Sequence, residues 1–500
     1  MRKIMKLISL MAVLLLALTA CGNNSSTKGT DEDGNRDTLN VVISYEPGSL
    51  DGLDYTFMEY KDQFGIYEPL VTLVDGTSYD CRLAESYEVN EEGTVYTFTI
   101  RKGVKFHNGE EMTMADIQYS MERWLNDANE GYVISDYLAD LSYDYDNYTV
   151  TFTLTGPILD FLNDLSSVPV VNQKAIEEGG ELYGRSPVGT GPYKMVEWKA
   201  TQYISVTRFD DYWGDKGLIK DINYRIIKET TSAIASLEKG EVDVLLGIPS
   251  AEIDRVSALD GITVETTDSP KQCYYFINTT NVDKPVRQAI NLAIDRQAII
   301  DLVENGHAHI PTSHIEGRIS DPGKSYDYER DVEKAKQILA DAGYSSGYTM
   351  TLLHNGSDDI KVAQIIQNSL ADIGITLEIE SIDSGAFWDQ VMAKDFQMYG
   401  RTVSLSLPDA YAFIKTFASD NTSNFVSCSR EDIDAAFEVI ETLPDCEERT
   451  AQVEIAMDAL YDEACLLPIY IGETNIVYNS NLKGLSVNRI DAYDLSKVSW

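Results

Sequence analysis

Apolar residues recur along the chain with two periodicities, that of strands and that of helices, which predicts a mixture of the two. The run 39–44 is almost continuously apolar, as expected for a strand buried on both faces. The runs 95–100 and 148–154 alternate between apolar and polar residues, which predicts antiparallel strands with one solvated face. A further strand is expected over 376–382. No internal repeat or low-complexity segment interrupts this pattern after residue 38.

Helices are expected where apolar residues recur at helical spacing between start and stop signals. Thr113 and Asp116 have the spacing of a capping box and predict a helix that runs toward residue 127. Asp283 caps a second helix, which opens with Pro285 and continues to Val303. Two further expected helices, each followed by a glycine, are 329–342 and 359–373. The chain is therefore predicted to have an α/β fold with more than one domain.

The N-terminus carries the pattern of a secretion signal. Basic residues at positions 2, 3 and 6 precede an apolar run, 7–18, that is too short to span a bilayer. Small residues then lead to Cys21, and this arrangement resembles a bacterial lipoprotein signal. The resemblance implies removal of residues 1–20 and attachment of diacylglycerol and palmitate-type acyl chains to Cys21. Residues 21–38, which are rich in Gly, Asn, Ser, Thr and Asp, would form a flexible tether. A plain secretion signal with an incidental Cys21 is the alternative.

The charge of the chain excludes one class of partner. Among 500 residues, 81 Asp and Glu stand against 40 Lys and Arg, which gives a formal net charge of -41. Nucleic-acid binding depends on basic residues that displace phosphate counterions, so a nucleic-acid partner is not expected. Binding of the body to an anionic lipid surface is disfavoured for the same reason. With 43% hydrophobic residues, the chain is long enough for several domains with real cores.

Five blocks resemble, in their order and spacing, the peptide and nickel family of solute-binding proteins of ABC importers, family 5. The first block combines LAESY, YTFTIRKGVKFHNG and MADI, and later blocks include GTGPY and AKQILADAGY. The blocks lie at 83–117, 189–193, 286–296, 335–344 and 467–485. Each block is weak evidence alone, because capped helices and glycine turns are common, but five in the right order are strong.

The resemblance implies a periplasmic-binding-protein-like fold with two lobes and an extra α/β subdomain in the first lobe. Lobe I would have its core in three segments and its appended subdomain in a fourth, and lobe II would be continuous. These expected segments are 39–61, 179–275 and 477–500 for the core, 62–178 for the subdomain and 276–476 for lobe II. Two strands would cross between the lobes, near 274–278 and 468–477.

The function that the resemblance implies is capture of an oligopeptide-like ligand between the lobes and its delivery to an ABC permease. The protein would be a monomer, held at the extracytoplasmic face of the membrane by its lipid alone. No enzyme is expected, because HExxH, GxSxG and GxGxxG motifs do not occur. No cofactor is expected either. The alternatives are a metal, metallophore or oligosaccharide ligand, and a lipoprotein that senses its ligand instead of importing it.

The expected ligand-binding residues come from four parts of the chain. They are Tyr45, Glu46, Tyr275, Trp388, Arg401, Ser404 and Asp409. In the family's peptide binders, the loop that begins near Arg401 commonly carries a Trp at that position and, at the position of Ser404, an Asp that pairs with the peptide's ammonium group. Asp409 could replace that carboxylate or could simply cap the helix that follows it. Arg401 could bind a carboxylate or could pair with one of the chain's many acids.

The histidines and cysteines give little indication of a metal site or of disulfide bonds. His307, His309 and His314 lie within eight residues of one another, and imidazoles suit Ni, Zn or Cu, but surface histidines need no metal. Apart from Cys21, the cysteines are five in number and show no paired short spacing, so their connectivity cannot be assigned: Cys81, Cys273, Cys428, Cys446 and Cys465. Cys273 is expected to be a buried thiol in a strand.

Overall fold

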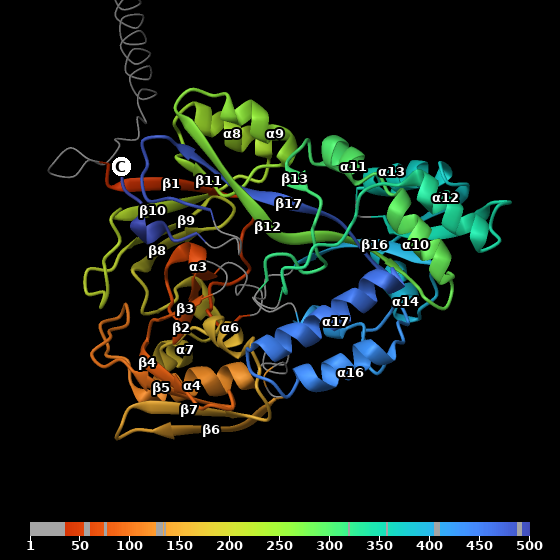
Figure 1. The fold of residues 1–500 in the computed structure, drawn as a ribbon. Helices are drawn as coiled ribbons and strands as arrows, with labels where there is room; N and C mark the ends of the chain where they lie inside the picture. The colour runs from red at the N-terminus through yellow and green to blue at the C-terminus, as the bar shows by residue number, and fades with distance from the viewer. Residues whose placement is uncertain are drawn as a thin grey trace, which may run out of the picture.

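Two long strands run through the middle of the molecule and belong to both of its lobes (Figure 1). Strand β12 (Ile262–Ile277) and strand β17 (Leu466–Asn479) pair antiparallel along most of their length. The computed structural model describes residues 36–54, 61–74, 78–126, 134, 137–318, 321–356, 359–404, 411–487 and 493–500. The two expected crossing segments lie on these strands, apart from the residue that follows the end of β12.

In the described part of the chain, β12 and β17 join an 11-stranded mixed sheet with the order β15-β14-β16-β12-β17-β11-β1-β10-β9-β8, and β13 pairs with β17. The remaining strands of this sheet are β1 (Thr38–Ile43), β8 (Tyr193–Lys199), β9 (Tyr203–Arg208), β10 (Asp221–Ile226), β11 (Val244–Leu245), β13 (Ala308–His309), β14 (Tyr348–Asn355), β15 (Ile375–Ile382) and β16 (Met398–Ser404). Parallel pairs occur on both sides of the crossing strands: β1 with β10 and β11, and β14 with β15 and β16. The fold is therefore an α/β fold with two lobes that share one sheet.

Lobe I carries an appended subdomain at the lower left of Figure 1. Its four-stranded antiparallel sheet has the order β4-β5-β7-β6, and β2 and β3 form a separate pair. These strands are β2 (Val71–Val74), β3 (Ser78–Cys81), β4 (Ala84–Val89), β5 (Val95–Ile100), β6 (Leu138–Asp144) and β7 (Thr149–Leu154). The helices of lobe I and the subdomain are α3 (Lys61–Phe64), α4 (Met114–Leu125), α6 (Phe161–Ser166), α7 (Gln173–Gly179), η1 (Gly180–Arg185), α8 (Thr230–Glu238), α9 (Ser250–Ser257) and η2 (Leu495–Lys497).

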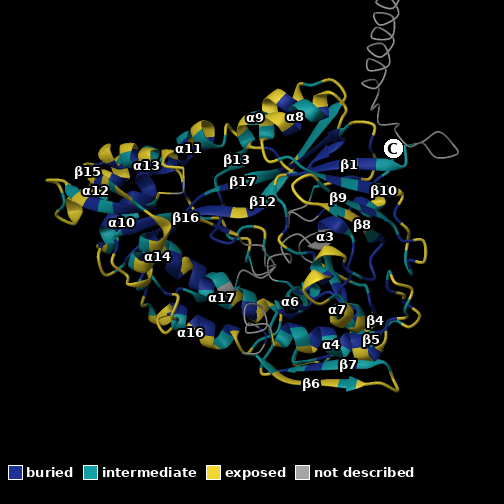
Figure 2. Cartoon of the chain, turned by 180° about the vertical axis from the view of Figure 1, so that it is seen from behind, coloured by how far each residue is buried: buried dark blue, intermediate teal, exposed yellow. Residues whose placement is uncertain are grey.

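Lobe II contains the helices that follow β12. They are α10 (Lys284–Ala293), α11 (Arg296–Val303), α12 (Val332–Asp341), α13 (Lys361–Ala371), α14 (Ser384–Met392), α15 (Tyr411–Lys415), α16 (Glu431–Ile440) and α17 (Glu447–Glu463). Figure 2 shows that exposed residues gather on loops and on the outer sides of the peripheral helices. The residue boundaries expected for the lobes stay a prediction.

Strand β12 separates two cores in lobe II because successive side chains of a strand point to opposite faces. Tyr274 and Phe276 belong to the cluster under α16 and α17, whereas Cys273, Tyr275 and Ile277 belong to the cluster under α10 and α13. This alternation explains why the run is apolar at almost every position, and Cys273 is buried there as expected. The five cysteines that the structure describes are free thiols.

The expected helix over 285–303 is wrong as a single element. The chain forms two helices instead, α10 and α11, because Ile294 takes an extended conformation between them. Asp295 then starts α11, since its side chain accepts a hydrogen bond from the backbone N–H of Ala298. The other expected helices and strands form with ends shifted by a few residues, and the capping box of Thr113 and Asp116 is present. None of the helices that the structure describes is long and apolar enough to cross a membrane.

Candidate ligand-binding site

A cavity of about 890 Å³ lies where the two lobes meet the crossing strands. Lobe I contributes the end of β1 with Tyr45, the side chain of Gln63 and the loop after β11. The crossing strands contribute 269–271 and 473–475, and Ser404 at the end of β16 comes from lobe II. Small-molecule sites in proteins commonly have volumes of about 300–1,000 Å³ and occur between domains. The cavity therefore has the size and position of a ligand site.

Buried hydrogen bonds fix the lobe I side of this cavity. Asn475 is 4% exposed, and its side-chain amide accepts from the backbone N–H of Ile248 and donates to the carbonyl of the same residue, both at 2.9 Å. This double contact holds the loop after β11 against β17. The Tyr45 hydroxyl donates to Oε1 of Gln63 at 2.9 Å. One wall of the cavity is thus set before a ligand arrives, which lowers the cost of binding.

An irregularity in the central strands brings a basic residue into the cavity. The pairing of β12 with β17 shifts register between Asp268 and Gln272, around Pro270. Lys271 stands there directly opposite Ser404 on β16. Within the described residues, the Lys271 ammonium forms no salt bridge, whereas Glu473 on the neighbouring strand is 3.1 Å from Nδ1 of His307. Lys271 therefore offers this cavity a positive charge that no described carboxylate neutralises.

Tyr45 and Ser404 line this cavity together, but Glu46, Tyr275, Trp388 and Arg401 do not. The carboxylate of Glu46 accepts hydrogen bonds from the indole N–H of Trp198 at 3.0 Å and from the backbone N–H of Thr201 at 3.1 Å. These contacts hold the turn between β8 and β9. Tyr275 is 5% exposed and packs in the core under α10 and α13, where its ring fills the space beside Gly400.

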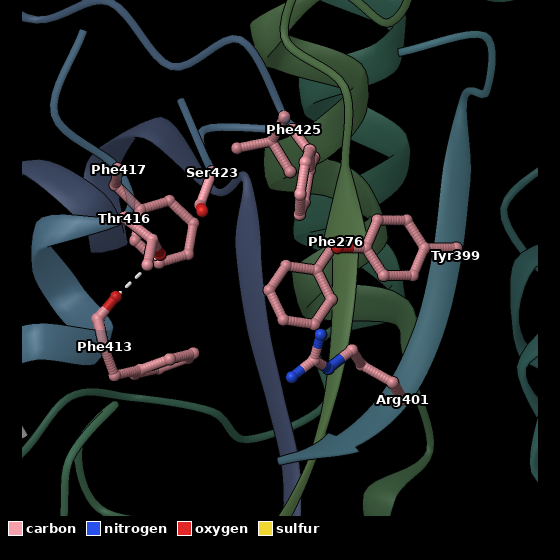
Figure 3. Close-up of a pocket in the computed structure, with 9 residues that line it drawn as sticks. Phe276, Tyr399, Arg401, Phe413, Thr416, Phe417, Ser423 and Phe425 are labelled. Atoms are coloured by element: carbon pink, nitrogen blue, oxygen red, sulfur yellow. Dashed lines mark hydrogen bonds between the residues drawn. The ribbon is translucent and has the colours of Figure 1, made fainter. Parts of the chain in front are cut away.

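Arg401 and Trp388 lie together at a second, smaller cavity. The Arg401 guanidinium is 5.4 Å from the centre of the Trp388 ring, a cation–π contact. Arg401 also lines a cavity of about 210 Å³ whose walls are mostly aromatic rings (Figure 3). Its side chain points to the opposite face of the sheet from that of Ser404, because three positions separate them. Asp409 and Cys21 lie outside the described residues.

The three clustered histidines have separate partners. His307 contacts Asp254 and Glu473, while His309 lies 3.3 Å from Glu316 and lowers the pKa of that carboxyl to about 2. His314 is fully buried under the carbonyl of Leu466, and burial lowers its pKa to about 4. Among the described residues, no group of three or more possible ligands is arranged to hold a metal ion.

Sequence reasoning missed the residues that the sheet irregularity and the aromatic cavity contribute. Pro270 within a strand is a known sign of a bulge and could have indicated that Lys271 leaves the regular ladder. Nothing in the sequence distinguishes Asn475 from other polar residues of a strand, since its role depends on Ile248, 227 residues away.

A family model and two kinds of similar protein identify the group to which the chain is related. The model of the bacterial extracellular solute-binding proteins, family 5, matches residues 79–425. The chain belongs to this family. The family 5 protein is 30% identical over 423 residues to the glutathione-binding protein GsiB of Salmonella typhimurium, covering 80% of the chain and 82% of the relative. Members of the family are binding proteins of transport systems and not enzymes.

Solved structures agree with the fold. The periplasmic binding protein DppA of Helicobacter pylori, in complex with the peptide STSA, superimposes with a TM-score of 0.73 at 25% identity, covering 92% of this chain and 98% of DppA. NikA of Brucella suis, in complex with Fe(III)-EDTA, gives a TM-score of 0.82 at 23% identity over 92% of this chain and 99% of NikA. The likeness to NikA concerns the fold alone. Both structures bear out the two-lobed fold that the sequence blocks implied.

Proposed function

We propose that this family 5 protein captures a peptide-like ligand between its two lobes and delivers it to an ABC permease. The observation that supports this most directly is the cavity of about 890 Å³, which takes its walls from both lobes and from both crossing strands. A ligand there contacts both lobes only when they are closed, so it stabilises the closed form by its higher affinity for that form. A permease can then distinguish loaded from empty protein.

Two relatives support a peptide-like ligand. GsiB is named for glutathione, which is a modified tripeptide, and the DppA structure contains a four-residue peptide. One residue argues for a ligand different from those of most peptide binders of the family, because Ser404 stands where an Asp commonly pairs with the ammonium group. Lys271, opposite Ser404, adds a positive charge at the same place. We therefore infer that the ligand presents a carboxylate or a carbonyl to this part of the cavity.

We also propose that the protein is held at the extracytoplasmic face of the membrane by lipid on Cys21, through the tether 21–38, and that it acts as a monomer. The segments expected for the lobes would then move as two bodies about the crossing strands. The strong negative charge of the chain keeps the body away from anionic lipid headgroups, so the lipid is its attachment.

The test is a ligand screen on the protein without residues 1–20 and with Cys21 replaced by Ser. Peptides of two to five residues, glutathione, nickel–histidine complexes and oligosaccharides are compared by thermal shift and by native mass spectrometry. A peptide that raises the melting temperature through binding to the native state supports the proposal. If metal complexes or oligosaccharides alone bind, the ligand class is wrong, and if a bound peptide is hydrolysed, the chain is not a pure binding protein.

Binding alone does not separate import from sensing. Uptake of a labelled form of the bound peptide by cells with and without the protein makes this distinction. Loss of uptake in the deletion strain supports delivery to a permease, whereas unchanged uptake with loss of a transcriptional response supports a sensor.

A further inference from the structure

The aromatic cavity beside Arg401 is built from one face of two neighbouring strands. Arg401 and Tyr399 alternate on β16 and stand opposite Tyr274 and Phe276 on β12, so that all four side chains share one face of the sheet. The Phe276 ring stacks on Tyr399, with 4.8 Å between ring centres and an angle of 7° between the planes. Burial raises the pKa of Tyr399, so its hydroxyl stays neutral. These rings form a flat and rigid floor.

Helix α15 and the loop after it form the opposite wall. Phe417 lies parallel to Phe276 with 6.4 Å between ring centres, and Phe413 meets Phe417 edge to face at 5.9 Å. The side-chain amide of Asn424 donates to the carbonyls of Ala418 and Cys428 and accepts from the Cys428 N–H. The wall is therefore held in place by its own buried hydrogen bonds.

The loop is also tied to the end of β12. The backbone N–H and the hydroxyl of Thr279 donate to the carbonyls of Val426 and Ser427 at 2.8 Å and 2.6 Å. Phe425 then covers the upper side of the cavity in Figure 3. A preorganised wall of this kind lowers the cost of ordering the site when a ligand binds.

Arg401 is the charged group of this cavity. Figure 3 shows its guanidinium reaching toward the space between the rings of Phe276 and Phe413. In the part of the chain that the structure describes, this guanidinium forms no hydrogen bond or ion pair, and its contact is the ring of Trp388. Other arginines of lobe II do pair with acids, as Arg430 does with Asp432 at 2.6 Å. Because no described carboxylate pairs with it, the Arg401 guanidinium can bind an anionic group that enters this cavity.

The chemistry of this cavity favours a ligand that carries both a carboxylate and an apolar group. A guanidinium binds a carboxylate through two parallel N–H···O bonds, and the low-dielectric aromatic surroundings strengthen that contact. A cavity of about 150 Å³ with apolar walls can hold a benzene molecule, so about 210 Å³ is sufficient for one phenyl or branched aliphatic group. We propose that this cavity is a binding subsite for a carboxylate that carries one aromatic or branched aliphatic group.

Two sources can supply this chemistry. One is the C-terminal residue of a peptide ligand, and this source rests on the proposed function. The other is a free aromatic acid that binds lobe II independently of the central cavity. The probes are therefore Gly-Gly-Phe and Gly-Gly-Gly, each as the free acid and as the C-terminal amide, together with 3-phenylpropionate.

Calorimetric titration of the wild-type protein, of Arg401→Gln and of Arg401→Lys tests the subsite. We expect the wild type to bind at least one phenyl-bearing acid about 10- to 100-fold more tightly than its amide, the range expected for hydrogen bonds to a charged group. Arg401→Gln removes this difference, and Arg401→Lys retains part of it because the charge remains without the planar fork. Lys336→Gln, at an exposed position on α12, is the matched control for a lost positive charge and leaves the difference intact.

The aromatic walls have their own test. Phe413→Ala is expected to reduce the preference for Gly-Gly-Phe over Gly-Gly-Gly about 10-fold while leaving the preference for acid over amide in place. If only the free acid 3-phenylpropionate binds, the subsite stands and the peptide function fails. If Gly-Gly-Phe binds equally as acid and amide, the subsite is wrong while the peptide function survives. If none of the probes bind, the subsite is wrong, and the broader ligand screen decides the peptide function.

Discussion

His314 shows at the scale of a single residue how burial makes stability depend on pH. Its ring is fully buried between the carbonyl of Leu466 and the hydroxyl of Tyr328, and burial lowers its pKa to about 4. In the unfolded chain, the group binds a proton below a pH of about 6.5. Between about pH 6.5 and 4 the unfolded state therefore holds the extra proton, and the free energy of unfolding falls as the pH falls.

We expect His314→Gln to flatten this dependence. The slope of the free energy of unfolding against pH, measured by chemical denaturation between pH 4.5 and 6.5, should decrease by up to about one proton, or about 1.4 kcal/mol per pH unit. The slope is the readout because the substitution of a buried side chain also destabilises at every pH. His107, whose pKa burial likewise lowers to about 4, provides an independent second case. Unchanged slopes in both variants would contradict the assignment.

The lipid attachment is also a prediction about one residue. Cys21→Ala removes the thiol that would carry the acyl chains, and each buried methylene group contributes about 0.8 kcal/mol to membrane binding. We expect the variant to move from the membrane fraction to the soluble fraction, as followed by fractionation and immunoblotting. Cys273→Ala, at a buried position in β12, is the control and stays with the membranes. A Cys21→Ala protein that still sediments with membranes would disprove lipid anchoring at this residue.

Residue roles could be predicted only where they depend on short stretches of sequence. The capping box of Thr113 and Asp116 lies within four residues, so its spacing alone predicts it correctly. The placement of Glu46 depends on Trp198, 152 residues away, and its hydrogen bonds could not be inferred from the neighbours of Glu46. The same holds for the rings around Arg401, which come together only through the pairing of β12 with β16.

At the scale of elements, the turn Gly189-Thr190-Gly191 joins lobe I to its subdomain by close backbone contacts. Gly191 donates from its N–H to the carbonyl of Ile66 at 2.9 Å, and the N–H of His107 donates to the carbonyl of Gly189 at the same distance. A Cβ atom on Gly191 would lie 2.3 Å from the carbonyl oxygen of Gly65. No side chain fits there without a shift of the backbone, which is why glycine occupies this turn.

Gly191→Ala should therefore destabilise the protein by about 1–3 kcal/mol, the usual cost of forcing an added group into a packed site. Chemical denaturation of the soluble protein measures this free energy. Gly472→Ala is the matched control, because a Cβ atom there would lie 3.9 Å from the Tyr470 ring and the backbone is not left-handed. Equal effects of the two substitutions would show that the close approach at Gly191 does not limit stability.

The break between α10 and α11 shows why element boundaries were harder to predict than element types. The apolar spacing continues through Ile294, but the Arg296 guanidinium donates to the carbonyls of Asn291 and Pro468. A continuous helix would engage the Asn291 carbonyl within its own ladder and would turn Arg296 elsewhere. The tertiary contact therefore overrides the local pattern.

At the scale of the whole molecule, the order of the five sequence blocks was enough to predict the α/β fold with two lobes. The central cavity could not be predicted in the same way, because its walls come from residues between 43 and 493 that meet through sheet order. Its size and lining depend on how far the lobes approach each other. The relative position of the two lobes therefore determines the geometry of the site.

The lobes touch far from the crossing strands, at the tip of the subdomain. A Cβ atom on Gly93 would lie 3.5 Å from that of Pro444 in lobe II, and one on Gly156 would lie 3.5 Å from the carbonyl oxygen of Glu441. These contacts are far enough from the hinge that a small rotation separates them. Opening of the lobes would therefore break these contacts.

A disulfide at this tip should lock the closed form. The distance between the Cβ atoms of residues 93 and 444 falls in the range of about 3.5–4.5 Å that disulfides require. We expect the oxidised variant Gly93→Cys with Pro444→Cys to show in small-angle scattering the same radius of gyration with and without ligand, and to release bound ligand much more slowly than the wild type. Reduction should restore both properties, although Cys at position 93 costs some stability because its φ is +69°. The single variants control for the native thiols, and rapid ligand exchange in the disulfide-linked protein would show that opening at the tip does not limit access to the cavity.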